Sequence, residues 1–137
     1  NPAIQQREGL DWAIQRRLNM VELLMLRGKA YVSLQEDYAK AHDDFARVVQ
    51  LDPQFGEAHS KLGGALYALG ETDAAMVELK TAINLGYDSA DTRFILGWIY
   101  EKKGEKELAI ENFRKALELN PHDRSARIHL EILGVKE

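Results

Sequence analysis

Apolar residues recur along this chain every three or four positions, which is the spacing of one face of an α-helix. The segment 106–119 is the clearest case, with apolar residues at Leu108, Ala109, Ile110, Phe113, Ala116 and Leu117. Short polar turns at 35–37, 70–72 and 104–105 separate neighbouring helical segments. The pattern therefore predicts an all-α protein built from pairs of helices.

The helical pattern itself repeats. Gly28, Gly63 and Gly97 are 35 and 34 residues apart, and after each of them come an alanine and, four residues later, a large apolar residue. These following pairs are Ala41 and Phe45, Ala75 and Leu79, and Ala109 and Phe113. Glycine inside a helix costs about 1 kcal/mol relative to alanine, so three glycines in one register indicate close helix packing. We predict repeats at 21–55, 56–89 and 90–123.

The third copy reads Leu96-Gly97-x2-Tyr100, then Ala109-x3-Phe113, then Pro121. This spacing resembles the tetratricopeptide repeat family, from which only Arg93, at the first motif position, departs. The other copies depart more: the first has one extra residue in its turn, and the second has Tyr87 at the proline position. The resemblance implies a right-handed superhelix of stacked antiparallel helix pairs, an α-solenoid with a concave binding surface.

The two ends have weaker patterns. Residues 1–20 predict an N-terminal helix that caps the first repeat or remains from a truncated one, and Gly9 weakens its continuity. Residues 124–137 predict a C-terminal capping helix, with one apolar face and one polar face. The chain begins Asn-Pro-Ala rather than with methionine, as an excised domain would. We assign no compartment, a cytoplasmic location being only the default.

Residues 94–100 are mostly large and apolar over a full helical circumference, whereas a helix in a small soluble protein usually has a single apolar stripe. Leu96, Gly97 and Tyr100 match positions that pack within the pair, so Phe94 and Trp98 lie on another side. The resemblance implies that this side lines the concave surface. The predicted partner-binding residues are Met25, Lys29, Val32, Ser60, Gly64, Tyr67, Phe94, Trp98, Glu101 and Lys102, with Glu22, Glu57 and Asp91 near the helix starts.

Two plainer explanations compete with this hypothesis. Phe94 and Trp98 could pack against the chain's own terminal helices or a neighbouring repeat. The acidic residues could simply complement the dipoles of the helices that they begin. Chaperone-binding members of the family hold a terminal carboxylate with basic and amide side chains. The residues here at such positions are Met25, Lys29, Lys61, Asp91 and Ile95. Only the two lysines are polar and non-acidic, so we do not expect a carboxylate clamp.

The net charge, the cysteine count and the missing motifs argue against several classes of function. The net charge is −4 and there is no cysteine, so we expect no nucleic-acid partner and no thiolate chemistry. The sequence lacks the phosphate-binding and nucleophile motifs, and it has no membrane-length apolar run. His59 falls at a packing position, and His122, Asp123 and His129 lack the spacing of a helical metal site. We therefore predict no enzyme, cofactor or metal.

The prediction is a protein–protein interaction module that binds a peptide or helix of a partner, in a scaffold or adaptor role. The alternative is a structural module that forms homo-oligomers through its terminal helices, with Trp12 at the contact.

Overall fold

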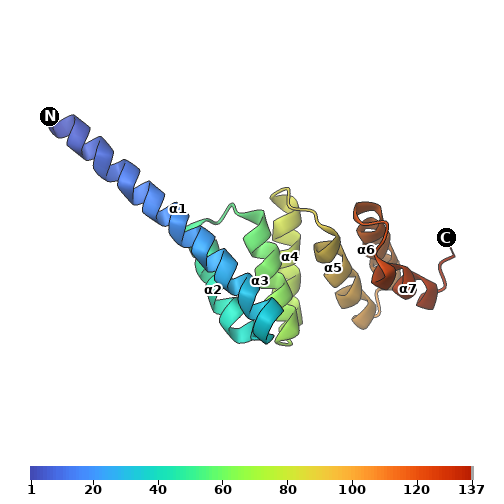
Figure 1. Ribbon diagram of the computed structural model, residues 1–137. Helices are drawn as coiled ribbons and strands as arrows, with labels where there is room; N and C mark the ends of the chain where they lie inside the picture. Colours follow the sequence, from blue (N-terminus) through green and yellow to red (C-terminus); the bar gives the residue numbers. More distant parts are fainter. Residues whose placement is uncertain (137) are drawn as a thin grey trace.

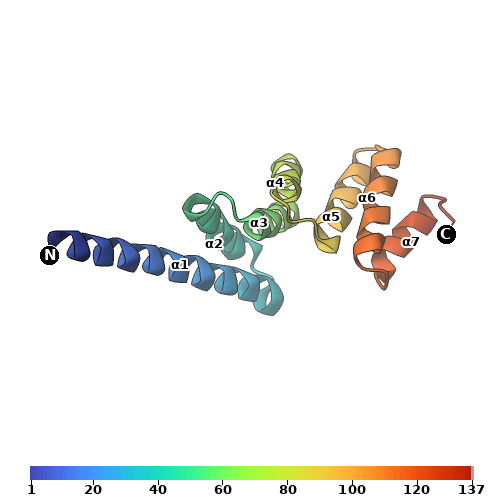
Figure 2. The ribbon, with the colours of Figure 1, turned by 90° about the horizontal axis from the view of Figure 1, so that it is seen from above.

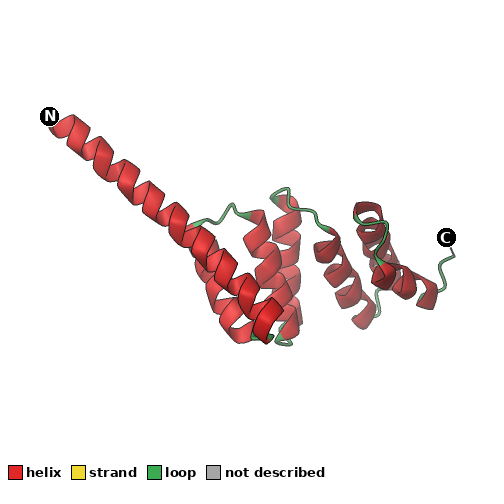
Figure 3. Cartoon of the chain, in the orientation of Figure 1, coloured by secondary structure: helices red, strands yellow, loops and turns green. Residues whose placement is uncertain are grey.

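The computed structural model describes residues 1–136, and within them it contains seven helices and no strand (Figures 1 and 3). The helices are α1 (Pro2–Gln35), α2 (Tyr38–Leu51), α3 (Gly56–Ala68), α4 (Thr72–Asn84), α5 (Ala90–Lys102), α6 (Lys106–Leu119) and α7 (Arg124–Ile132). The predicted all-α class is confirmed.

The helices pack as successive pairs, α1 with α2, α3 with α4, and α5 with α6. Each pair also contacts the next, through α2 against α3 and α4 against α5, so the pairs form a stack (Figure 2). Tight turns close the hairpins: Gly70 and Gly104 adopt φ values of 85° and 79°, a region that favours glycine. In the first hairpin Glu36 takes this role, at φ 50°.

The three glycines of the repeat lie where the two helices of a pair come closest. A Cβ atom would lie 2.6 Å from the Phe45 ring at Gly28, 2.7 Å from Leu79 at Gly63 and 2.8 Å from the Phe113 ring at Gly97. These distances are shorter than a carbon–carbon contact permits. The glycines therefore allow the large side chains of the second helices to enter the core.

Polar side chains at one repeat position, His59 and Arg93, fasten the second and third hairpins to the loops before them. The Nε2 atom of His59 donates to the Pro53 carbonyl at 2.8 Å, and Nδ1 contacts the Glu78 carboxylate at 2.6 Å. Arg93 binds both carboxylate oxygens of Asp88, at 2.7 and 2.9 Å. These hydrogen bonds from Arg93 lower the pKa of Asp88. The predicted packed state of His59 is confirmed, since the residue is buried.

The N-terminal region differs from the expected separate helix. Residues 2–20 continue without a break into the first helix of repeat 1, and α1 is 34 residues long. Residues 1–20 are exposed throughout and project from the stack, so they do not cap repeat 1 (Figures 1 and 2). Gly9 does not interrupt the helix, because a single glycine costs only about 1 kcal/mol. No helix within residues 1–136 combines the length and the apolar character that crossing a membrane requires.

At the other end, α7 occupies part of the predicted segment 124–137, and Glu137 lies outside the described residues. Ala126 and Leu130 of α7 are buried, and α7 packs against α6. The His129 ring stacks on the Phe113 ring, with centroids 5.1 Å apart and planes 18° apart. This helix therefore covers one side of the third repeat.

Candidate binding groove

A hollow of about 710 Å³ lies along the first helices of the three pairs, and we call it the groove. Side chains from α1, α3 and α5 form most of it, and α2 contributes at one end. The lining residues are Lys29, Val32, Ser33, Tyr38, Phe45, Ser60, Lys61, Gly64, Ala65, Tyr67, Ala68, Asp91, Phe94, Ile95 and Trp98. Its volume is within the range of about 300–1,000 Å³ typical of binding pockets.

Eight of the predicted partner-binding residues meet in this groove although they come from three repeats. They are Lys29, Val32, Ser60, Gly64, Tyr67, Asp91, Phe94 and Trp98. The hairpin stack brings them together, because it places the first helices of consecutive pairs on the same side.

Two predicted residues of α1, Met25 and Glu22, do not line the groove. Met25 is only 5% exposed and belongs to the core, so it cannot contact a partner. Glu22 is exposed, but it lies in the middle of the long helix rather than at a helix start. The idea that Glu22 complements a helix dipole is therefore wrong for repeat 1. Glu57 and Asp91 do lie in the first turns of α3 and α5.

Three other predicted residues lie around the groove rather than in its lining. Glu57 forms an ion pair with Lys29. Glu101 contacts Nδ1 of His129 at 3.1 Å and so connects α5 to α7. The Lys102 ammonium lies 5.1 Å from the centre of the Tyr67 ring and 5.5 Å from that of Trp98.

The aromatic side chains form one connected cluster. The Phe94 ring lies 5.8 Å from Trp98, 5.6 Å from Phe113 and 5.6 Å from His129, measured between ring centroids. Trp98 also lies 5.4 Å from Tyr67. Phe94 is thus partly packed by its own chain, as the plainer explanation expected. Trp98 keeps 37% of its surface exposed, so the chain does not enclose it.

The middle of the groove is apolar and its polar atoms are mostly engaged. The Ser60 hydroxyl is 2.6 Å from the Thr92 hydroxyl, which also contacts Ser89 at 2.8 Å. Gly64 leaves room above Ile95, whose Cδ1 would lie 3.7 Å from an added Cβ. The groove therefore offers an incoming group mainly hydrocarbon and aromatic surface.

The groove carries little unpaired charge. Lys29 is neutralised by Glu57. Among residues 1–136, Lys61 and Asp91 line the groove without an ion-pair partner. One free cation and one free anion give the groove no strong net charge.

Comparison with known proteins identifies the architecture. Two models of the tetratricopeptide repeat match this chain, at residues 34–95 and 90–123. The chain belongs to the tetratricopeptide repeat family. The predicted solenoid is thereby confirmed, and membership of this repeat family supports a protein–protein interaction module.

The relatives and solved structures differ in how much of their own length this chain matches. The cell division cycle protein 27 homolog of Caenorhabditis elegans is 31% identical over 93 residues, which is 68% of this chain but 12% of that protein. The crystal structure of MamA is 30% identical, with a TM-score of 0.72 over 90% of this chain and 74% of that chain. The first tetratricopeptide domain of Spaghetti (RPAP3), bound to an HSP90 peptide, has a TM-score of 0.76 at 20% identity and covers 85% of this chain and 91% of that one.

Sequence reasoning missed Tyr38, Phe45 and Ala65 as lining residues, and it considered Lys61 and Ile95 only as carboxylate-clamp positions. Tyr38 and Phe45 belong to α2, the second helix of its tetratricopeptide pair, which the motif assigns to packing. Phe45 does fill the core against Gly28, but its ring also reaches the groove. The repeat motif contains no signal for such a double role.

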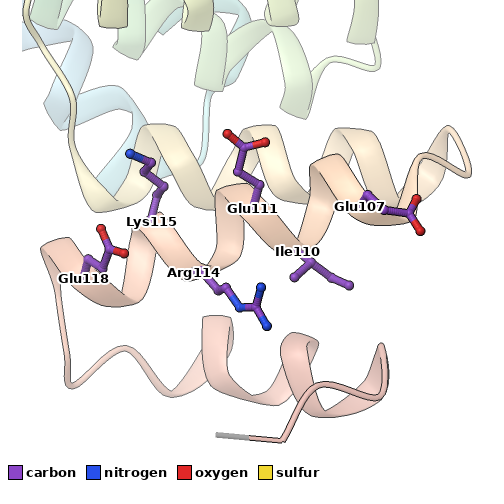
Figure 4. A pocket seen from close by; sticks show the side chains of 6 residues that line it. All are labelled: Glu107, Ile110, Glu111, Arg114, Lys115 and Glu118. Atoms are coloured by element: carbon purple, nitrogen blue, oxygen red, sulfur yellow. The ribbon is translucent and has the colours of Figure 1, made fainter.

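A smaller hollow of about 370 Å³ lies along α6 (Figure 4). All of its side chains come from this one helix: Glu107, Ile110, Glu111, Arg114, Lys115 and Glu118. Five of these six are charged with both signs, as is typical of a solvated helix face. Among residues 1–136, no three histidine or acidic side chains are arranged to hold a metal ion.

Proposed function

We propose that the groove binds a peptide or helical segment of a partner protein through an apolar anchor side chain, with no cofactor. The observation that carries this proposal is the half-open aromatic cluster, in which Trp98 stays 37% exposed beside Phe94 and Tyr67. Aromatic side chains at the centre of a recess are the usual hot spots of protein interfaces.

The contacts of the cluster support a surface formed before binding. Phe94 is held by Phe113 below it and by His129 beside it, and both neighbours are fixed by α6 and α7. Binding therefore needs little ordering of these rings, and ordering of side chains is one of the main costs of association. An adaptor that captures short segments benefits from such a rigid surface.

The chemistry of the lining favours an apolar segment over an acidic terminus. The HSP90 peptide SRMEEVD is bound by the RPAP3 domain, and at 20% identity that likeness supports the fold alone. In this chain one of the two free charges of the groove is the anion Asp91. A strongly acidic peptide would meet this carboxylate, whereas an apolar anchor would find Trp98, Val32 and Ile95.

The test is a selection of random displayed peptides on the immobilised chain, followed by calorimetry with a synthetic copy of an enriched peptide. Trp98→Ala should weaken binding by about 2 kcal/mol, or about thirty-fold. Trp12→Ala is the matched control, because Trp12 is 64% exposed on the projecting part of α1. Equal affinities of wild type and Trp98→Ala, with helical content preserved, would refute the proposal, as would a selection that enriches no peptide.

A second function is favoured by the projecting part of α1. Leu10, Ile14 and Leu18 follow one another at intervals of four residues on one face of the helix and are 60%, 59% and 54% exposed, and contiguous apolar surface of this kind commonly marks an interaction site. We propose self-association through this segment as the alternative. Light scattering should then show a mass that rises with concentration in the wild type and not after deletion of residues 1–18. A constant monomer mass would exclude it.

A further inference from the structure

Tyr67 occupies a distinctive place in the groove. It lies on α3, in the middle repeat, and is half-buried among the lining residues. Its ring contacts Trp98 of α5, and the Lys102 ammonium lies over both rings. The neighbouring repeat therefore covers it.

The Tyr67 hydroxyl is buried and has no hydrogen-bond partner. Among residues 1–136 it is the only buried side-chain nitrogen or oxygen atom in this condition. The buried Ser60 hydroxyl of the same groove, by contrast, is paired with the Thr92 hydroxyl. Leaving a buried hydroxyl unpaired costs about 1–3 kcal/mol, so the free protein carries a penalty that a suitable ligand atom would remove.

The ammonium group above Tyr67 is loosely held. Lys102 is exposed, and its ammonium has no ion-pair partner among the described residues. Its contacts with the Tyr67 and Trp98 rings are cation–π interactions, worth about 0.5–1 kcal/mol at exposed sites. A bound segment can therefore displace the Lys102 ammonium at small cost, while the rings stay in place.

We infer that the Tyr67 hydroxyl is a specificity-determining hydrogen-bond donor of the groove, and that it pairs with a carbonyl oxygen next to the apolar anchor of the bound segment. This inference rests on the proposed function and names the chemistry of its ligand. An oxygen acceptor suits the site because Lys102, close to the same ring, is itself a donor. A purely hydrocarbon ligand would leave the hydroxyl unpaired.

The test is Tyr67→Phe, which removes one oxygen and keeps the ring. This change should raise the stability of the free protein and lower its affinity for the peptide. The urea midpoint of unfolding should rise, because an unpaired buried hydroxyl is lost. Affinity for the synthetic peptide selected on the wild type should fall about ten-fold. Tyr87→Phe is the control: Tyr87 lies outside the groove, in the loop between α4 and α5, its hydroxyl is not buried without a partner, and both quantities should stay unchanged.

The same peptide measured on Trp98→Ala separates this inference from the proposed function. If Trp98→Ala weakens binding and Tyr67→Phe does not, the groove is the site and the role of the hydroxyl is refuted. If neither variant weakens binding, both proposals fail. A lower urea midpoint for Tyr67→Phe would show that the hydroxyl is bonded in the free protein, and this too would overturn the inference.

Discussion

Two adjacent glycines in α3 allow the packing argument to be tested within a single turn of helix. Gly63 faces α4, where an added Cβ would lie 2.7 Å from Leu79 Cγ and 3.2 Å from the Ala75 carbonyl oxygen. Gly64 faces the groove, where an added Cβ would meet only Ile95, at 3.7 Å. Alanine at 63 therefore forces its neighbours to move, whereas alanine at 64 makes an ordinary contact.

The expected changes in the free energy of unfolding follow from helix propensity and from overpacking. Alanine in place of glycine in a helix interior stabilises the fold by about 1 kcal/mol at either position. At Gly63 overpacking opposes this gain by about 1–3 kcal/mol, since Leu79 is fully buried and has no free space to occupy. Gly64→Ala should thus raise the free energy of unfolding by up to about 1 kcal/mol. Both variants gain the same helix propensity, so the difference between them reports overpacking alone. The free energy of unfolding of Gly63→Ala should be about 1–3 kcal/mol lower than that of Gly64→Ala.

The assay is urea unfolding of the wild type and both variants, followed by the helical circular dichroism signal. Equal slopes would show that the variants expose the same surface on unfolding, so that their midpoints report stability directly. If Gly63→Ala were as stable as Gly64→Ala, the close approach of α3 and α4 at this glycine would not limit the packing, and the explanation of the repeated glycines would be wrong.

Two further predictions concern polar groups outside the groove's aromatic cluster. Thr92→Val removes the partner of the buried Ser60 hydroxyl while keeping the side chain's shape, and should lower the free energy of unfolding by about 1–3 kcal/mol; an unchanged urea midpoint would contradict this. Arg93 lowers the pKa of Asp88, so the ionised carboxylate stabilises the fold above the ordinary carboxyl pKa of about 4 and loses this contribution as the pH falls below it. Asp88→Asn should therefore show a shallower loss of thermal stability in acid than wild type, and a profile equal to that of the exposed control Asp11→Asn would refute this.

Much of the fold is predictable because it depends on local repetition. The apolar spacing, the turns and the glycine register each reflect contacts within one hairpin, and three copies reinforce one another. The continuous α1 was not predictable from this pattern. Gly9 weakens a helix locally, but nothing in residues 1–20 provides a stronger alternative structure, so the helix continues.

The groove was predictable only in part. Met25 and Val32 lie two turns apart on α1, yet Met25 is in the core and Val32 lines the groove. The difference depends on where α2 and α3 cover α1, which the repeat pattern does not specify. Phe45 and Tyr38 of α2 also reach the groove, where the motif alone would not place them.

The sequence by itself determined that this chain forms paired helices with a repeat of 34 or 35 residues, because helix periodicity and turn chemistry are properties of short segments. Tertiary structure alone decided that Trp98 stays open and that the Tyr67 hydroxyl is covered without a partner. Both outcomes depend on how one repeat packs against the next. The burial of such a side chain is decided by neighbours about thirty positions away in the sequence, roughly the length of one repeat.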